Sequence, residues 1–162
     1  MIDDTAAFVR GVVDDNLFMI LGTADGDGRP WTSPVYFTHA DYREFYWMSS
    51  PDVTHSRNLA RRPEVSIVIF DSRVRPGDGA PVYLAAVAEE LAGDDVERAL
   101  TVYPGPLQPG VRSVTLADVT APSPYRLYRA TASEHSILCP RPTGVPCALH
   151  GRAYDHRTTV TP

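Results

Sequence analysis

The sequence predicts a small, mainly β protein, an antiparallel barrel with peripheral helices. Short polar turns at residues 25–28 and 40–43 separate the first apolar segments, so that successive strands are joined as hairpins. The segment 65–70, VSIVIF, is apolar on both faces apart from Ser66, which is typical of a strand inside a closed barrel. Because hairpin-linked strands cannot lie parallel to each other, these observations exclude a parallel α/β fold.

The first half of the chain predicts one helix and a three-stranded meander. Apolar residues recur at helical spacing over residues 3–15, and a polar residue among positions 3–5 can cap this helix. Three strands then follow, at residues 17–24, 29–39 and 44–48. The second of them alternates between two faces, which indicates one buried and one exposed side.

The second half of the chain predicts three more strands and less helix. The strands are residues 65–70, 82–91 and 125–133, and the last one can continue to Leu138. Asp94 or Asp95 is placed to cap a helix over residues 96–103, and residues 115–119 form at most one helical turn. From Cys139 onward prolines and glycines interrupt regular structure, so residues 139–162 are expected to form an extended C-terminal arm.

Pro34 lies in the middle of the second predicted strand. Proline cannot donate a hydrogen bond to a neighbouring strand, so this segment is predicted to lie at an edge or to accept a ligand along that edge. The sequence leaves both readings open.

The stretch 49–59, SSPDVTHSRNL, is predicted to be a capped helical turn. Ser50 can act as N-cap and Pro51 fits the first helical position. Free N–H groups at such a turn attract anions. Hydroxyl and basic side chains accompany them, at Ser49, Thr54, His55, Ser56 and Arg57. The turn is therefore either a solvated connector or a phosphate site.

Composition and the absence of several motifs argue against some classes of function. The 162 residues suffice for one domain, and a net charge of −5 argues against nucleic-acid or anionic-membrane partners. All 15 basic residues are Arg. The chain lacks GxGxxG, P-loop and GxSxG motifs, a membrane-length apolar run and a signal-peptide pattern, so we expect a cytoplasmic protein.

The C-terminal region contains the only soft metal ligands that fall close together in the sequence. His135, Cys139, Cys147 and His150 follow the spacing H-x3-C-x7-C-x2-H. This spacing matches no established zinc pattern and a proline-rich loop lies between the cysteines, so we predict no metal site.

The order of these segments resembles a known family. The stretches GRPWTSPVYF (28–37) and FYWMSSPDVTHSRNLARRPEVSIVIF (45–70) are similar to the pyridoxamine 5′-phosphate oxidase-like FMN-binding split-barrel family. Residues 82–91 and 125–138 continue the likeness, which covers roughly residues 8–138. The resemblance implies a six-stranded antiparallel split β-barrel over residues 1–138. It also implies a homodimer with FMN bound between the subunits.

The resemblance also implies which residues meet the cofactor. The strand beside the flavin ring matches Ser33, Pro34, Val35 and Tyr36. The strand end beside the ribityl chain matches Met48, Ser49 and Ser50, and the phosphate positions match Thr54 and His55, next to Ser56. A strand start that reaches the partner's flavin matches Ala80, Pro81 and Val82. His55 stands where many relatives have Lys, so phosphate binding is expected to depend on pH.

The function that this likeness implies is an FMN-dependent oxidoreductase that moves a hydride between flavin and a small-molecule substrate. Two alternatives stay open: a deazaflavin-dependent reductase, and a non-enzymatic flavin- or haem-binding module on the same fold. No side chain is assigned as a catalytic acid or base. The substrate-binding arginine and histidine of the oxidase itself find no match, so vitamin B6 oxidase activity is not expected.

Overall fold

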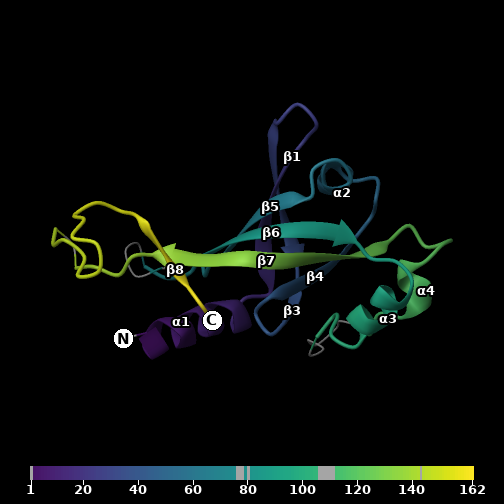
Figure 1. Ribbon diagram of the computed structural model, residues 1–162. Helices are drawn as coiled ribbons and strands as arrows, with labels where there is room; N and C mark the ends of the chain where they lie inside the picture. The colour runs from purple at the N-terminus through teal and green to yellow at the C-terminus, as the bar shows by residue number, and fades with distance from the viewer. Residues whose placement is uncertain (1, 76–78, 80, 106–111, 143) are drawn as a thin grey trace.

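The computed structural model describes residues 2–75, 79, 81–105, 112–142 and 144–162 (Figure 1). Its helices are α1 (Ile2–Asp14), α2 (Thr54–Leu59), α3 (Asp94–Leu100) and α4 (Leu116–Val119). Its strands are β1 (Phe18–Ala24), β2 (Pro30–Tyr36), β3 (Thr38–Ala40), β4 (Glu44–Ser49), β5 (Glu64–Ile69), β6 (Val82–Glu90), β7 (Arg126–Leu138) and β8 (Arg157–Val160). The mainly β prediction is confirmed.

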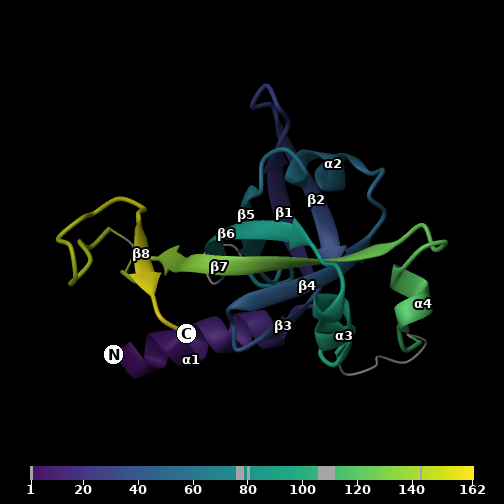
Figure 2. The ribbon, with the colours of Figure 1, turned by 45° about the vertical axis from the view of Figure 1, so that its right-hand side comes forward.

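One curled antiparallel sheet contains all the strands. Its order is β2-β1-β5-β6-β7-β4-β3, and β8 pairs with β7 beside this path. The two strands at the ends of the path, β2 and β3, are consecutive in the chain. The chain therefore passes from one edge of the curled sheet to the other at Phe37, and Figure 2 shows β1 and β2 rising from the layer that β4, β6 and β7 form. This is the split-barrel arrangement that the sequence predicts.

The sheet has eight strands in the described part of the chain, not the six predicted. One reason is Phe37, where the predicted strand 29–39 divides: β2 pairs with β1, whereas β3 pairs with β4. The side chain of Phe37 is buried and its N–H donates to the carbonyl of Leu17 at 3.2 Å, which turns the chain from one partner strand to the other. The other reason is β8, inside the segment 139–162 that was expected to be an extended arm.

Two apolar clusters fill the fold. The larger one lies inside the curled sheet, and its largest buried side chain is that of Trp47, which stacks on Tyr128 with ring centroids 5.5 Å apart. The smaller cluster joins α3 and α4 to β4 and β7 through Val96, Val119, Tyr46 and Leu127. α1 packs against the larger cluster through Val9 and Val13.

The helix starts differ from the predictions at two places. α2 begins at Thr54 with Val53 at its N-cap, so Ser50 and Pro51 are not the cap and the first helical residue. The Ser50 hydroxyl instead accepts a hydrogen bond from the N–H of Asp52 at 3.2 Å, which completes a tight turn one step earlier. α3 begins at Asp94 after Gly93, so the acidic residues lie in the first turn and favour its N-terminal dipole without capping it.

Other predicted helices and strands are confirmed, with small differences in their boundaries. α4 is a single turn with a capping box between Thr115 and Asp118. β7 runs the full length to Leu138, and β2, which holds Pro34, is an edge strand. None of the helices in the described part of the chain is long and apolar enough to cross a membrane.

Candidate cofactor-binding site

His55 connects three of the four segments that the family resemblance associates with a cofactor. Its Nδ1 lies 3.1 Å from the hydroxyl oxygen of Ser33 on β2, and its Nε2 lies 2.9 Å from that of Ser49 at the end of β4. Each hydroxyl can donate or accept, so one serine donates to the imidazole and the other accepts from it. The His55 cluster, defined as Ser33, Ser49 and His55, is thus a continuous hydrogen-bonded row.

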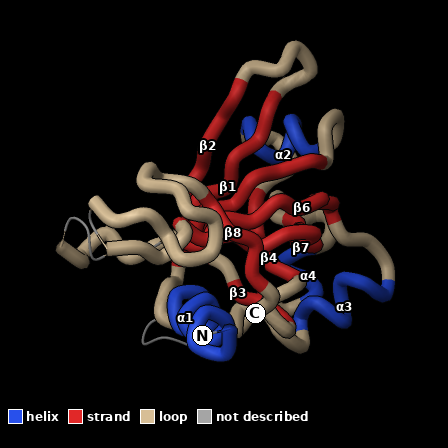
Figure 3. Tube along the Cα trace, turned by 60° about the vertical axis from the view of Figure 1, so that its left-hand side comes forward, coloured by secondary structure: helices blue, strands red, loops and turns tan. Residues whose placement is uncertain are grey.

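The position of α2 explains why this row forms. Asn58 is buried and its Nδ2 donates to the Thr23 hydroxyl on β1 at 3.0 Å. Arg62 donates to the carbonyl of Gly26 in the β1–β2 turn at 3.0 Å. These bonds hold α2 against the β1–β2 hairpin (Figure 3), which brings the helix start up to Ser33.

The environment of His55 disfavours its positively charged form. It is buried, and burial lowers the pKa of its imidazole, because the charged form loses solvation there. His55 therefore orients the two serine hydroxyls rather than supplying a positive charge. The nearest basic side chain along the chain, Arg57, is exposed and donates to the carbonyl of Asp52.

β2 presents a mixed face at the edge of the sheet. Pro34, opposite Ile20 of β1, is exposed, and Trp31 is 49% exposed while its indole N–H donates to the Ser33 hydroxyl at 3.1 Å. Val35 instead points into the core. Tyr36 donates to the carbonyl of Pro104 at 2.8 Å. Of the four predicted ring-contacting residues, the side chains of Ser33 and Pro34 face the cluster side or solvent, and the other two are used in packing.

The remaining predicted residues divide into two groups. Ser50 and Thr54 lie partly exposed between β4 and α2, close in the chain to Ser49 and His55. Met48 packs at the border of the smaller apolar cluster. Ser56 is buried, and its hydroxyl has no hydrogen-bond partner among the described residues. Burial raises the pKa of the neighbouring Tyr128 to about 12, and the Ser56 hydroxyl offsets part of that rise. The side chain of Ser56 faces the interior.

The predicted β6 residues lie elsewhere in the chain. Val82 is fully buried in the larger cluster and pairs with Ile69, and Pro81 lines a cavity of about 410 Å³ between α1 and the end of β5. Ala80 lies outside the described residues. Among the residues that the structure describes, no hydrogen bond joins Pro81 or Val82 to the His55 cluster.

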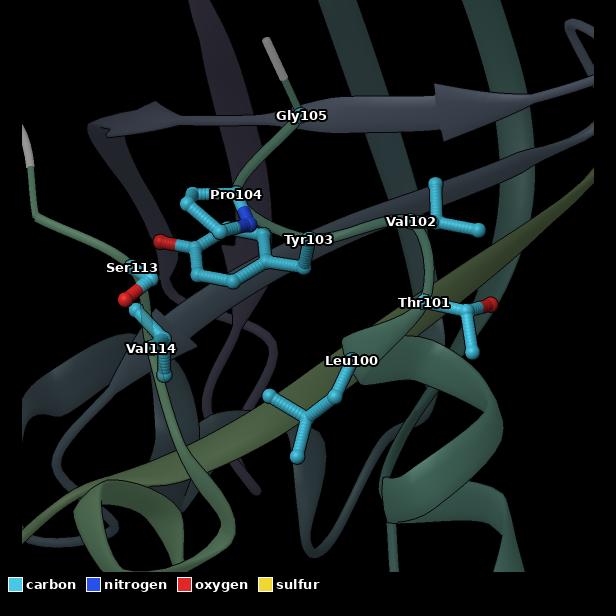
Figure 4. A pocket seen from close by; sticks show the side chains of 8 residues that line it. All are labelled: Leu100, Thr101, Val102, Tyr103, Pro104, Gly105, Ser113 and Val114. Carbon is cyan, nitrogen blue, oxygen red and sulfur yellow. The ribbon is translucent and has the colours of Figure 1, made fainter. Parts of the chain in front are cut away.

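A second concavity lies beside α3. This cleft, of about 420 Å³, is shown in Figure 4. Its walls are Leu100, Thr101, Val102, Tyr103, Pro104, Gly105, Ser113 and Val114. Burial raises the pKa of Tyr103 to about 12, so its phenol is uncharged. None of the predicted cofactor residues lines this cleft, but Tyr36 reaches its rim through its bond to Pro104 and an edge-to-face contact with the ring of Tyr103.

Acid should destabilise the protein through two buried histidines. Burial lowers the pKa of His55 and, against a bond to the Tyr42 carbonyl, that of His135. The unfolded chain binds protons at these groups below about pH 6.5, whereas the folded chain does not, so stability is present above that pH and lost as pH falls. Thermal melts from pH 7.5 to 5 should show a falling Tm. His55→Gln and His135→Gln should each make the decline shallower than in the unchanged protein.

Comparison with known proteins identifies the family of this chain. The model of the pyridoxamine 5′-phosphate oxidase family matches residues 5–137, which include the whole His55 cluster and strands β1 to β7 except the last residue of β7. The chain belongs to the pyridoxamine 5′-phosphate oxidase family. A search of curated proteins finds no match.

Solved structures agree with the family at the level of the fold. A haem-binding protein from Mycobacterium smegmatis is 22% identical with a TM-score of 0.65. The match covers 95% of this chain but only 57% of the length of the Mycobacterium protein. HutZ, the haem storage protein of Vibrio cholerae, is 19% identical with a TM-score of 0.57, over 78% of this chain and 89% of its own. A Clostridium acetobutylicum protein related to general stress protein 26, of the pyridoxine phosphate oxidase family, is 12% identical with a TM-score of 0.61. That match covers 98% of this chain and 96% of the Clostridium chain.

Proposed function

We propose that this member of the pyridoxamine 5′-phosphate oxidase family binds FMN along the free edge of β2 and acts as a flavin-dependent oxidoreductase. The observation that carries the proposal is the His55 cluster, which links an open, proline-interrupted edge strand to the polar turn before α2. An edge strand offers backbone groups that no neighbouring strand uses, and a planar ring can accept and donate hydrogen bonds there.

The residues present fit the parts of FMN unequally. The backbone of Ser33–Tyr36 and the exposed Trp31 suit the ring, and Ser49 and Ser50 suit the ribityl hydroxyls. For the phosphate, the neutral His55 leaves the Thr54 hydroxyl and the exposed Arg57 guanidinium as the matching donors. When bound, the flavin supplies the hydride chemistry, and the protein orients the ring and limits access to it.

We propose that the protein is a homodimer with a flavin in each of two clefts between the subunits. The β2 side of one chain leaves large apolar side chains in solvent, with Trp31 49% and Phe18 57% exposed. A second subunit covering this side would enclose the ring and leave an opening for a small-molecule substrate. In that dimer, the β6 start with Pro81 and Val82 would approach the flavin of the partner.

Haem binding is a second candidate, because two of the structural relatives are haem proteins. Deazaflavin binding is a third, since the open β2 edge would accept that ring equally well. The three cofactors differ in colour and in fluorescence, so a single preparation distinguishes them.

The test is the absorption spectrum of the purified protein before and after incubation with FMN, followed by chromatography of the cofactor released on denaturation. We expect a flavin spectrum, about one FMN per chain, and oxidation of a reduced nicotinamide by the loaded protein. Ser33→Ala should weaken FMN binding roughly fivefold to tenfold, because one hydrogen bond of about 1 kcal/mol is lost.

The matched control is Ser113→Ala, in the cleft beside α3, which should bind FMN as the unchanged protein does. A preparation that stays colourless with FMN contradicts the proposal. A Soret band with no flavin supports the haem candidate instead.

A further inference from the structure

Four soft ligands meet in the C-terminal segment, far from the His55 cluster. Cys139, Cys147, His150 and His156 each turn one sulfur or nitrogen atom to a common point, and these four atoms all lie within 4.8 Å of one another. Both cysteines are free thiols. His135, which the spacing in the sequence grouped with these cysteines, is not part of the cluster, because its Nε2 bonds to the Tyr42 carbonyl at 2.7 Å.

The separations are those of ligands around one small ion. The Cys139 and Cys147 sulfurs lie 3.5 and 3.7 Å from His150 Nδ1, and the Cys147 sulfur lies 3.3 Å from His156 Nε2. The two histidine nitrogens are 3.1 Å apart. With Zn–S near 2.3 Å and Zn–N near 2.0–2.1 Å, a tetrahedron requires about 3.3 Å between nitrogens and about 3.6 Å between nitrogen and sulfur.

The pairing of β8 with β7 brings the distant ligands together. Antiparallel pairing sets Leu138 opposite Arg157, and the N–H of Cys139 donates to the carbonyl of His156 at 2.8 Å. A tight turn supplies the other two ligands: the Cys147 carbonyl accepts from the N–H of Gly151, and the Cys147 sulfur accepts from the N–H of His150 at 3.2 Å. An N–H aimed at sulfur stabilises a thiolate.

The tautomer of His156 suits a metal ligand. Its Nδ1 lies 2.8 Å from the carbonyl of Tyr154, and only a protonated Nδ1 can donate to that oxygen. In the neutral ring, Nε2 then carries the free lone pair that faces the cluster. A backbone carbonyl behind a metal-bound histidine is a common supporting contact.

The segment has no apolar core to hold it in this shape. Among the described residues 139–156, only Cys139 and Cys147 are buried, whereas Val145, Leu149 and Tyr154 are exposed. Figure 1 shows the segment extending beyond the end of β7, away from the barrel. A loop without a hydrophobic core needs another source of order, and a metal ion commonly supplies it in small modules.

We propose that Cys139, Cys147, His150 and His156 bind one Zn²⁺ ion in a structural, four-coordinate site. Two thiolates and two neutral imidazoles complete the coordination shell, so no position is left for substrate. Binding releases the thiol protons to solvent, and the two negative sulfurs balance the charge of the ion. The ion fixes the loop to β7 and β8, independently of any cofactor at the His55 cluster.

The test uses the full-length protein expressed with zinc and freed of loosely bound metal by gel filtration. Elemental analysis should give about one zinc per chain, and Co²⁺ exchange should produce the visible and near-ultraviolet bands of tetrahedral thiolate coordination. Cys147→Ser and His156→Ala should lose the zinc, whereas Leu149→Ala, an exposed neighbour that is not a ligand, should keep it. Chelation should speed protease cleavage within residues 139–156 and leave the barrel intact.

A wild-type protein that carries no zinc and binds Co²⁺ no better than Cys147→Ser overturns the proposal, and so does a Cys139–Cys147 disulfide in the isolated protein. Iron or haem held by these residues in place of zinc also overturns it. If Cys147→Ser fails to fold, the Co²⁺ spectrum of the wild-type protein decides the question alone.

Discussion

Replacing His55 with alanine should weaken FMN binding roughly tenfold to a hundredfold, by the same factor at pH 6.5, 7.5 and 8.5. His55 holds the Ser33 and Ser49 hydroxyls in place through two hydrogen bonds. Without these bonds the two hydroxyls are no longer fixed, and we expect FMN binding to lose about 1–3 kcal/mol of free energy. We expect no strong dependence on pH, because burial lowers the pKa of His55 and so disfavours the charged ring. Fluorescence titration with FMN at the three pH values measures it.

This expectation differs from the one that the sequence alone suggests, in which a charged His55 replaces a lysine on the phosphate. His55→Gln, which can still bond to one serine, should recover part of the affinity. His39→Ala is the matched control, since His39 bonds to Asp14 and not to the cluster. A loss confined to the acidic end of the range would show that His55 acts as a cation, contrary to the positioning role.

Replacing Trp47 with alanine should lower the free energy of unfolding by about 3–5 kcal/mol. Trp47 is fully buried, stacks on Tyr128, and is the largest buried side chain. Its removal also withdraws support from Tyr128, whose hydroxyl bonds to Glu90 at 3.1 Å and lies near Ser56 of α2. Chemical denaturation followed by circular dichroism gives the value.

Two further variants test whether the loss of stability comes from the buried position of Trp47. The Trp47 indole N–H is buried and has no partner among the described residues, so Trp47→Phe removes a desolvated donor and should cost about 1 kcal/mol or less. Trp31→Ala, at a half-exposed tryptophan, should change stability by less than about 1 kcal/mol and should instead weaken FMN binding. Equal destabilisation by Trp47→Ala and Trp31→Ala would contradict the assignment of Trp47 to the centre of the core.

The strands of the barrel were predictable because their signals are local. The polar turns at residues 25–28 and 40–43 and the apolar run at 65–70 need no knowledge of the rest of the chain. The break at Phe37 was not predictable, because Phe37 continues the alternation of the strand and only its change of partner, from β1 to β4, divides it.

The candidate site was predictable in its members but not in their chemistry. The family likeness selects Ser33, Ser49 and His55, and the structure joins them. The lowered pKa of His55 depends on its burial against strands that are distant in the sequence, which no sequence pattern reports.

The cluster of Cys139, Cys147, His150 and His156 was even less predictable from the sequence. His156 meets Cys139 only because β8 finds a free edge on β7, and the sequence 157–160, RTTV, is too short to predict as a strand within a region rich in proline and glycine. The spacing therefore grouped His135 with the cysteines, although the strand returns His156 to them.

The most direct test of the proposed site is the change in backbone amide NMR signals of the ¹⁵N-labelled protein on titration with FMN. We expect the largest shifts at Ser33, Val35 and Tyr36 of β2 and at Ser49, Ser50 and Thr54 beside α2, in slow or intermediate exchange. Shifts confined to the cleft around Tyr103 and Val114, or no shifts at all, would contradict it.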